Sequence, residues 1–329
     1  AATANAGSPC TTAAATYTGP ATQAASTGVG SASSIQALRS DATRTTRAHA
    51  VYASRGGTVL LGSSVSIEAR GGGSRGIFAT GAGSTVRAAG DVSILTRGGA
   101  NQSYDYAIGV HAAAGGIVTI QGALDVQSGT VATAHYSPAV LAEGAGSQIH
   151  LQSVRTVTTS PPASGLEAGA GGTVTATDVD LLVSGVKQGY AYGILSGGQN
   201  SSVTIRGGVI TEKSLSASWL PPPFGDGNTS NSALRAIDKG AIAVTGDLIV
   251  DTDGFGARGA YASEGGVIRL NNTRITTRGT SSPGLQIGKS RAVGTGPGVI
   301  VSTGALNIAT GTPSSPGIYI EGNGSRLDA

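Results

Sequence analysis

The stretch LEAGAGGTVTATDVDLLVS at residues 166–184 contains one complete unit of a pattern that recurs along the chain. The unit starts with apolar and small residues, passes a Gly-Gly pair, and continues as an alternation of apolar and polar residues. Val174 and Ala176, for example, flank Thr175. Because successive side chains of a strand point to opposite faces, this alternation predicts short strands with one apolar face.

Nine full units and one incomplete unit follow this pattern. Their starts lie at residues 51, 77, 108, 140, 166, 194, 234, 260 and 285, with the fragment beginning at 318. Successive starts are 25 to 40 residues apart. These intervals suit one coil of a parallel β-helix, and they are too variable for leucine-rich or hexapeptide repeats.

Aligned positions support the repeat. The first apolar position after the turn holds Val59, Val86, Val118, Ile149, Val174, Val203 and Ile268, and the second holds Leu61, Ala88, Ile120, Leu151, Ala176, Ile205 and Leu270. The position between them is polar in six of these seven units. No unit can bury its apolar face alone, whereas stacked units form a continuous core. We therefore predict an all-β, right-handed parallel β-helix of about ten coils.

The composition agrees with this fold class. The chain of 329 residues contains 54 glycines, about one in six against a usual share of roughly 7%. Four Lys and six Glu leave few residues to fill helix surfaces, so an all-helical protein is excluded. The net charge of +3 gives no reason for the chain to stay unfolded. We expect many of the glycines to lie at the corners of successive coils.

The domain organisation is predicted from the extent of the repeats. Residues 1–34 are rich in Ala, Thr, Ser and Gly and are expected to be an N-terminal arm or cap, followed by a single β-helix domain over 35–329 that is cut from a longer chain. The single Cys10 cannot form an intramolecular disulfide. The sequence has no run of 18 or more apolar residues, so it predicts no membrane-spanning helix. The small-residue start is typical of a mature exported segment.

The Ala/Gly-rich coils of the form GVxAxxGGxVxIxGxxxVxT resemble the passenger domains of bacterial type V autotransporters, closest to the pertactin-like branch. The resemblance covers residues 35–329. It implies export from a Gram-negative bacterium and display at, or release from, the cell surface, with membrane attachment only through a C-terminal outer-membrane barrel that is missing here. No Arg-Gly-Asp motif is present, which excludes integrin binding by that motif.

The resemblance implies a virulence factor that binds a host protein or cell-surface receptor, in adhesion or in immune or complement evasion. Loops on one side of the β-helix would make the contact. Three alternatives remain: a self-associating passenger, a purely structural stalk, and a polysaccharide-degrading enzyme on the same fold.

Catalytic motifs are weak, and we predict no enzymatic activity and no catalytic, cofactor-binding or metal-binding residues. The GAGS sequences at 81–84 and 144–147 recur in the turn, so their serines are expected at corners. Four histidines are dispersed over different repeats and suggest no Ser-His-Asp set. They are His49, His111, His135 and His150.

Charged motifs are also expected to be structural. Two Asp-x-Asp pairs, Asp178/Asp180 and Asp251/Asp253, could serve acid-base chemistry, but we predict that they are solvated residues on an outer face. Seven Arg-Gly dipeptides could suggest nucleic-acid binding, but their positions favour corners of the coils. We therefore expect no nucleic-acid partner.

Aromatic residues are rare, and most lie in the length-variable segments before the repeat starts. If the coils superpose, these segments emerge on one side of the rod, where Tyr and Trp are favoured contact residues. The insertion at 211–233, with its three consecutive prolines, is the strongest candidate. The predicted partner-binding residues are Trp219, Phe224, Tyr104, Tyr106, Tyr136, Tyr190 and Tyr192. Packing of each tyrosine over its own loop is the alternative.

Overall fold

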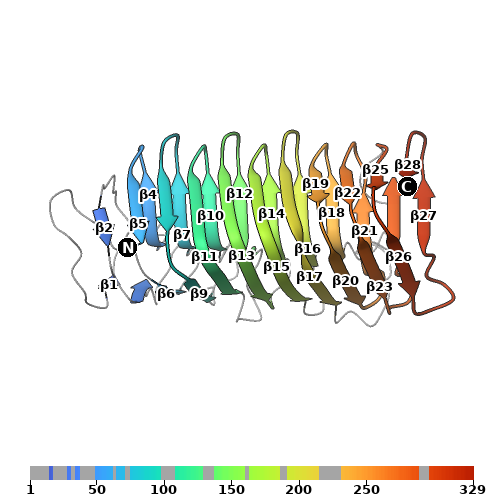
Figure 1. Cartoon of the computed structure of the whole chain (residues 1–329), viewed down its shortest axis with the longest axis horizontal. Helices are drawn as coiled ribbons and strands as arrows, with labels where there is room; N and C mark the ends of the chain where they lie inside the picture. The colour runs from blue at the N-terminus through green and yellow to red at the C-terminus, as the bar shows by residue number, and fades with distance from the viewer. Residues whose placement is uncertain are drawn as a thin grey trace, which may run out of the picture.

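The fold is taken from a computed structural model of the chain. It describes residues 15–17, 28–30, 34–37, 49–61, 64–70, 75–97, 108–128, 137–159, 163–185, 191–214, 231–288 and 296–329. Within these ranges the secondary structure is entirely β, with turns and bends between strands. Figure 1 shows the strands stacked side by side along one elongated rod.

The strands form two sheets. The ten-stranded sheet contains β4 (His49–Ser54), β7 (Arg75–Thr80), β10 (Ile108–Ala113), β12 (Val140–Glu143), β14 (Ala163–Gly169), β16 (Ala191–Gly197), β18 (Ser232–Ile237), β21 (Arg258–Ala262), β24 (Leu285–Gly288) and β27 (Ile318–Glu321). Each of these strands coincides with one repeat start or with the terminal fragment.

The second sheet has eighteen strands. Its N-terminal members are β1 (Ala15–Tyr17), β2 (Gly28–Gly30), β3 (Ser34–Ala37), β5 (Thr58–Leu61), β6 (Val65–Arg70), β8 (Thr85–Ala88), β9 (Val92–Arg97), β11 (Ile117–Ser128) and β13 (Gln148–Thr158). Its C-terminal members are β15 (Thr173–Gly185), β17 (Ser202–Ser214), β19 (Ala241–Val244), β20 (Leu248–Asp253), β22 (Val267–Leu270), β23 (Thr273–Thr277), β25 (Val299–Ser302), β26 (Leu306–Thr310) and β28 (Arg326–Asp328).

The chain alternates between the two sheets and pairs each strand in parallel with its equivalent in the next coil. β12, for instance, pairs with β10 and β14, while β13 pairs with β11 and β15. This is a right-handed parallel β-helix, as the repeat predicted, with about 8 turns where the repeat predicted about ten coils. The described strands within the expected N-terminal arm, β1 and β2, pair in parallel with β3 and β5 and so extend the larger sheet.

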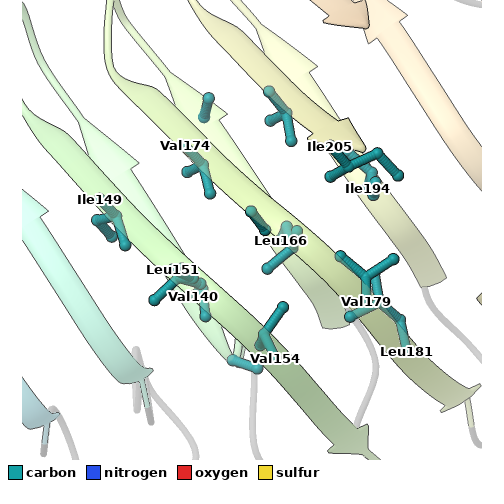
Figure 2. Close-up of a cluster of buried hydrophobic side chains, with 14 of the residues drawn as sticks. Val140, Ile149, Leu151, Val154, Leu166, Val174, Val179, Leu181, Ile194 and Ile205 are labelled. Carbon is teal, nitrogen blue, oxygen red and sulfur yellow. The ribbon is translucent and has the colours of Figure 1, made fainter. Parts of the chain in front are cut away.

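The core lies between the sheets, and the aligned apolar positions supply it. Val174 and Ile205 are fully buried, like most residues in their two columns, whereas the intervening Thr175 lies on the outer face. Figure 2 shows part of this core, to which Leu166 of β14 and Leu181 of β15 contribute. The predicted alternation and its inward face are therefore confirmed.

The turns between the sheets are joined by a column of buried serines. The Ser147 hydroxyl donates to the Glu143 carbonyl at 2.7 Å and accepts the Gly115 amide of the preceding coil at 3.0 Å. Ser201 repeats both bonds with Gly197 and Gly171. The expectation that the GAGS serines are corner residues is confirmed, and they also connect neighbouring coils.

Removing one of these hydroxyls should weaken the stack locally. In Ser147→Ala the Gly115 amide loses its partner in a partly buried turn, which costs about 1–2 kcal/mol of unfolding free energy. Ser93→Ala, at an exposed position of β9, is the matched control and should stay within about 0.5 kcal/mol of the native chain. Equal denaturation midpoints for the two variants in urea would contradict this role of Ser147.

Candidate functional site

A column of small residues shapes the outer face of the ten-stranded sheet. Gly76, Gly109, Gly165, Gly193 and Gly259 each precede an inward apolar residue. A Cβ at Gly76 would lie 2.5 Å from the Ile94 Cγ2 atom and 2.7 Å from the next coil's carbonyl oxygen. Each of these glycines and the apolar residue after it therefore both face the interior. The residues on either side of this inward pair consequently lie on the same outer face.

This outer face carries two stacked columns. The outer ladder, with one residue from each strand, consists of Tyr52, Phe78, His111, Leu141, Glu167, Leu195, Arg235, Tyr261, Gln286 and Tyr319. The flanking column lies three residues earlier in the chain and contains His49, Arg75, Ile108, Ser164, Tyr192, Ser232 and Arg258. Side chains of the two columns contact one another along the rod.

Aromatic rings and one guanidinium stack at the N-terminal part of the ladder. The ring of Phe78 lies 4.9 Å from the rings of both His49 and His111, measured between centroids. Tyr52 stacks on Phe78 from the preceding coil, and the Arg75 guanidinium lies 4.3 Å from the Phe78 centroid. Two histidines that are 62 residues apart in the sequence thus share one cluster because three coils lie side by side.

His111 is placed between two charged groups. The Arg75 Nε–H donates to His111 Nδ1 at 2.7 Å, so the ring proton lies on Nε2, which is 3.6 Å from Glu143 Oε2. The hydrogen-bonding contact with His111 lowers the pKa of the Glu143 carboxyl, and the positive charge of Arg75 adds to this effect against the opposing effect of burial. Both ring nitrogens of His111 are therefore directed at charged neighbours.

A second cationic and aromatic cluster lies in the C-terminal half of the ladder. Arg235 donates a hydrogen bond to the Tyr192 hydroxyl, and its guanidinium lies 5.5 Å from the Tyr261 ring centroid. The Arg258 guanidinium lies 5.0 Å from the same ring and donates to Gln286. Burial lowers the pKa of Arg258 to about 10, so the residue still carries its charge at neutral pH. These contacts join four successive coils.

Most residues of the outer ladder and the flanking column are buried, and many of their contacts are with neighbouring coils. Arg235, Arg258 and Tyr261 are each less than 9% exposed. A cation over an aromatic face contributes roughly 0.5–2 kcal/mol, more when it is desolvated. The arrangement therefore holds coils together on this face.

Glu212 is the exception among the buried charged residues, because it faces the interior. It belongs to an inward column near the ends of β11, β13, β15, β17, β20 and β23, which we call the long strands. Its other members are Ser128, Thr158, Val183, Thr252 and Thr277. Thr277 donates its hydroxyl to the Ser282 carbonyl at 2.7 Å, but neither carboxyl oxygen of Glu212 has a hydrogen-bond partner among the described residues. Burial, together with the charge of Asp253, raises the pKa of Glu212 well above its ordinary value.

The predicted contact residues fall into two groups. Tyr192 is buried and belongs to the flanking column, where its hydroxyl accepts a hydrogen bond from Arg235. It is therefore packed against the body of the rod. The other predicted residues lie outside the described part of the chain. They are Trp219, Phe224, Tyr104, Tyr106, Tyr136 and Tyr190.

The segments that contain those six residues all start and end at one edge of the rod. We define the insertion edge as the line where β9, β11, β13, β15 and β17 end and β10, β12, β14, β16 and β18 begin (Figure 1). Strand pairing aligns these ends, as Ser128 with Thr158 and Gly185 with Ser214. The joining segments are 98–107, 129–136, 160–162, 186–190 and 215–230.

The expected insertion at 211–233 is too wide. Thr211 to Ser214 belong to β17, and β18 begins at Ser232. The Asn231 side chain also accepts the Ala191 amide at 3.0 Å. The segment that can vary without breaking these contacts is therefore 215–230.

The Asp-x-Asp pairs lie on the outer face of the long strands, as predicted. Asp178 pairs with Arg206 at 3.1 Å, and Asp180 lies 3.6 Å from Arg155. Asp251 pairs with Arg278. Three of the four aspartates thus face an arginine across neighbouring strands, and the carboxylates do not converge.

The outer ladder and its flanking column were missed by sequence reasoning. Arg75 and Arg258 belong to Arg-Gly dipeptides that were expected at corners, yet both begin strands and are buried. The available signal was the glycine that follows them, since it precedes the same inward apolar position in several repeats. Glu212 also carried a signal, because it occupies an inward position of the alternation in β17.

Comparisons with known proteins do not assign this chain to a family, because no family model, curated protein or solved structure matches it. Among the described residues, no helix has the length and apolar character needed to cross a membrane.

Proposed function

We propose that this chain is an exported passenger of the autotransporter type, displayed on or released from a Gram-negative cell, that binds a host protein or cell surface through its insertion edge. One observation supports the proposal. All six predicted aromatic contact residues outside the described ranges belong to segments that join strands at the same edge. A rigid rod that holds variable segments in line is a suitable support for a binding surface.

The proposed mechanism is binding without catalysis. The coils fix the spacing of the segments, and aromatic side chains supply contact area at low conformational cost. The outer ladder stiffens the adjacent sheet through contacts such as Arg235 with Tyr192. Membrane attachment, in this proposal, requires a separate C-terminal barrel, and no cofactor, metal or nucleic acid takes part.

Replacing segment 215–230 by a short Gly-Asn-Gly turn tests the proposal. The purified chain and the variant are each immobilised and exposed to serum and to solubilised epithelial surface proteins, and retained proteins are quantified by mass spectrometry. We expect the native chain to retain a defined protein and the variant to lose at least about tenfold of it, since hot-spot residues carry most of the binding energy.

The matched control replaces segment 289–295 in the same way. This segment joins β24 to β25, and the adjoining ends of these two strands are at the opposite edge of the rod. Circular dichroism and thermal melting establish that both variants keep the β-helix. Equal loss of the retained protein in both variants, or unchanged retention without 215–230, would contradict binding through the insertion edge.

A further inference from the structure

The outer face of the long strands contains an exposed apolar pair. Val209 of β17 and Ile249 of β20 are direct neighbours in register, and they are 38% and 50% exposed. At the equivalent position, other coils carry the charged residues Asp125, Arg155 and Asp180. Two adjacent apolar residues therefore interrupt a charged column.

The residues on either side of this pair have opposite charge. Asp180 is the register neighbour of Val209, and Arg274 is the register neighbour of Ile249. The column thus reads Asp180, Val209, Ile249, Arg274 across four coils. Both terminal side chains are exposed, and Asp180 also lies 3.6 Å from Arg155.

A second column, four residues further along the strands, also contains one cation and one anion. Lys213 of β17 is the register neighbour of Asp253 of β20, and both are exposed. Neither Lys213 nor Arg274 forms an ion pair with another described residue. Within the described part of the chain, the face therefore presents two cations without an ion-pair partner beside an apolar centre.

This pattern is self-complementary under a two-fold rotation. The axis runs parallel to the strands, midway between β17 and β20, and reverses the direction of the rod. It places Val209 against the Ile249 of a second copy, Asp180 against Arg274, and Lys213 against Asp253. An isologous contact of this kind makes each pairing twice.

We propose that this face, defined by Asp180, Val209, Lys213, Ile249, Asp253 and Arg274, binds a second copy of the chain in an antiparallel, side-by-side dimer. The two apolar pairs form the centre, and four interchain ion pairs surround them. Between the two charged columns lies a third column, two residues along the strands from Val209 and Ile249. The same rotation places its Thr211 against Asp251 and its Leu182 against Thr276 of the other copy, so no like charges meet in this column.

Charge complementarity selects a second copy as the occupant. An apolar centre with a polar rim is the usual anatomy of a protein interface, and exposed ion pairs add register more than affinity. The association should therefore be concentration-dependent and should weaken at high salt. It uses the long-strand face and not the insertion edge, so it stands independently of the proposed binding of a host partner.

Charge exchange tests the dimer by sedimentation velocity across a concentration series. Asp180→Arg alone and Arg274→Asp alone should each weaken dimerisation at least about tenfold, because two like-charge contacts replace two ion pairs. The double variant Asp180→Arg/Arg274→Asp should restore it, since the exchanged charges again oppose each other. Arg87→Asp, an exposed reversal on β8 away from this face, is the control and should leave dimerisation unchanged.

Cross-linking tests the orientation. In a Cys10→Ser background, a mixture of Asp180→Cys chains with Arg274→Cys chains should form mixed disulfide dimers, whereas Asp180→Cys chains alone should form few. A chain that sediments as a monomer at all concentrations would overturn the proposal. So would dimerisation that is insensitive to the single reversals, or equal cross-linking of Asp180→Cys chains with themselves.

Discussion

Gly76→Ala should destabilise the β-helix by about 2–3 kcal/mol, although the substitution adds only one methyl group. Its Cβ would lie 2.5 Å from the Ile94 side chain and 2.7 Å from the carbonyl oxygen of Gly109 in the next coil. Neither neighbour can move freely, because Ile94 is a buried core residue and the carbonyl belongs to the sheet backbone. Guanidinium unfolding followed by circular dichroism measures the effect.

Gly169→Ala is the matched control for this prediction. Gly169 ends β14, and a Cβ at this position would meet nothing within 4 Å. The change should be neutral or should stabilise by up to about 1 kcal/mol, since alanine restricts the unfolded chain. If the two alanine variants unfold at the same denaturant concentration, the close approach of coils at Gly76 is wrong.

Glu212→Val should stabilise the protein at pH 7 by about 1–3 kcal/mol, the range for a buried polar group without a partner. Glu212 is 0% exposed, and neither carboxyl oxygen has a hydrogen-bond partner among the described residues. Its register neighbour in β15 is Val183, so an aliphatic side chain suits this column. Thermal and chemical unfolding of the native and variant chains provide the comparison.

The gain should depend on pH with a defined sign. The folded-state pKa of Glu212 is raised above 4.5 by burial and by Asp253, so the proton binds more tightly to the folded chain. Stability linked to this group is full below about pH 4.5 and is lost as the pH rises through the folded-state pKa. Glu212→Gln should remove this loss, whereas Glu264→Gln, at the turn after β21, should keep it. If the unfolding free energies of the native chain and of Glu212→Gln depend on pH in the same way, the assignment is wrong.

The sequence predicted the core because its signal is local. The alternation of apolar and polar residues over only three positions, Val174 to Ala176, predicts which side chains face inward. The same alternation recurs in most units. Corner glycines were predicted for the same reason, and Gly115 and Gly171 indeed adopt positive φ at turns. Stacking then follows, because no single unit can bury its apolar face.

Contacts between coils were not predictable, because they depend on the exact register of strands that are distant in sequence. Tyr192 and Arg235 are 43 residues apart and are separated by an insertion of unrelated composition. The strand glycines were hidden among the corner glycines, since composition does not distinguish a residue that turns from one that allows close approach. Gly76 belongs to the second kind.

The proposed binding surface has a similar division. The sequence placed its aromatic residues in length-variable segments, and the strand ends that those segments join lie along one edge of the rod. The exposed pair Val209 and Ile249 was not noticed in the sequence, because alternation predicted polar residues at outward positions. Its flanking charges become meaningful only when four coils are aligned.

The stacking of coils in register underlies the ladder, the insertion edge and the dimer, and one distance tests it directly. Arg87 and Arg269 face outward from one column and are separated by six register steps, through Thr119, His150, Thr175, Thr204 and Ala243. At roughly 4.8 Å per step, spin labels at these two positions should lie about 29 Å apart. Pulsed electron paramagnetic resonance on the Cys10→Ser/Arg87→Cys/Arg269→Cys chain, diluted with unlabelled protein, measures this distance. A narrow distribution near that value is the predicted result, and a broad distribution or one centred beyond about 40 Å would contradict the stacked rod.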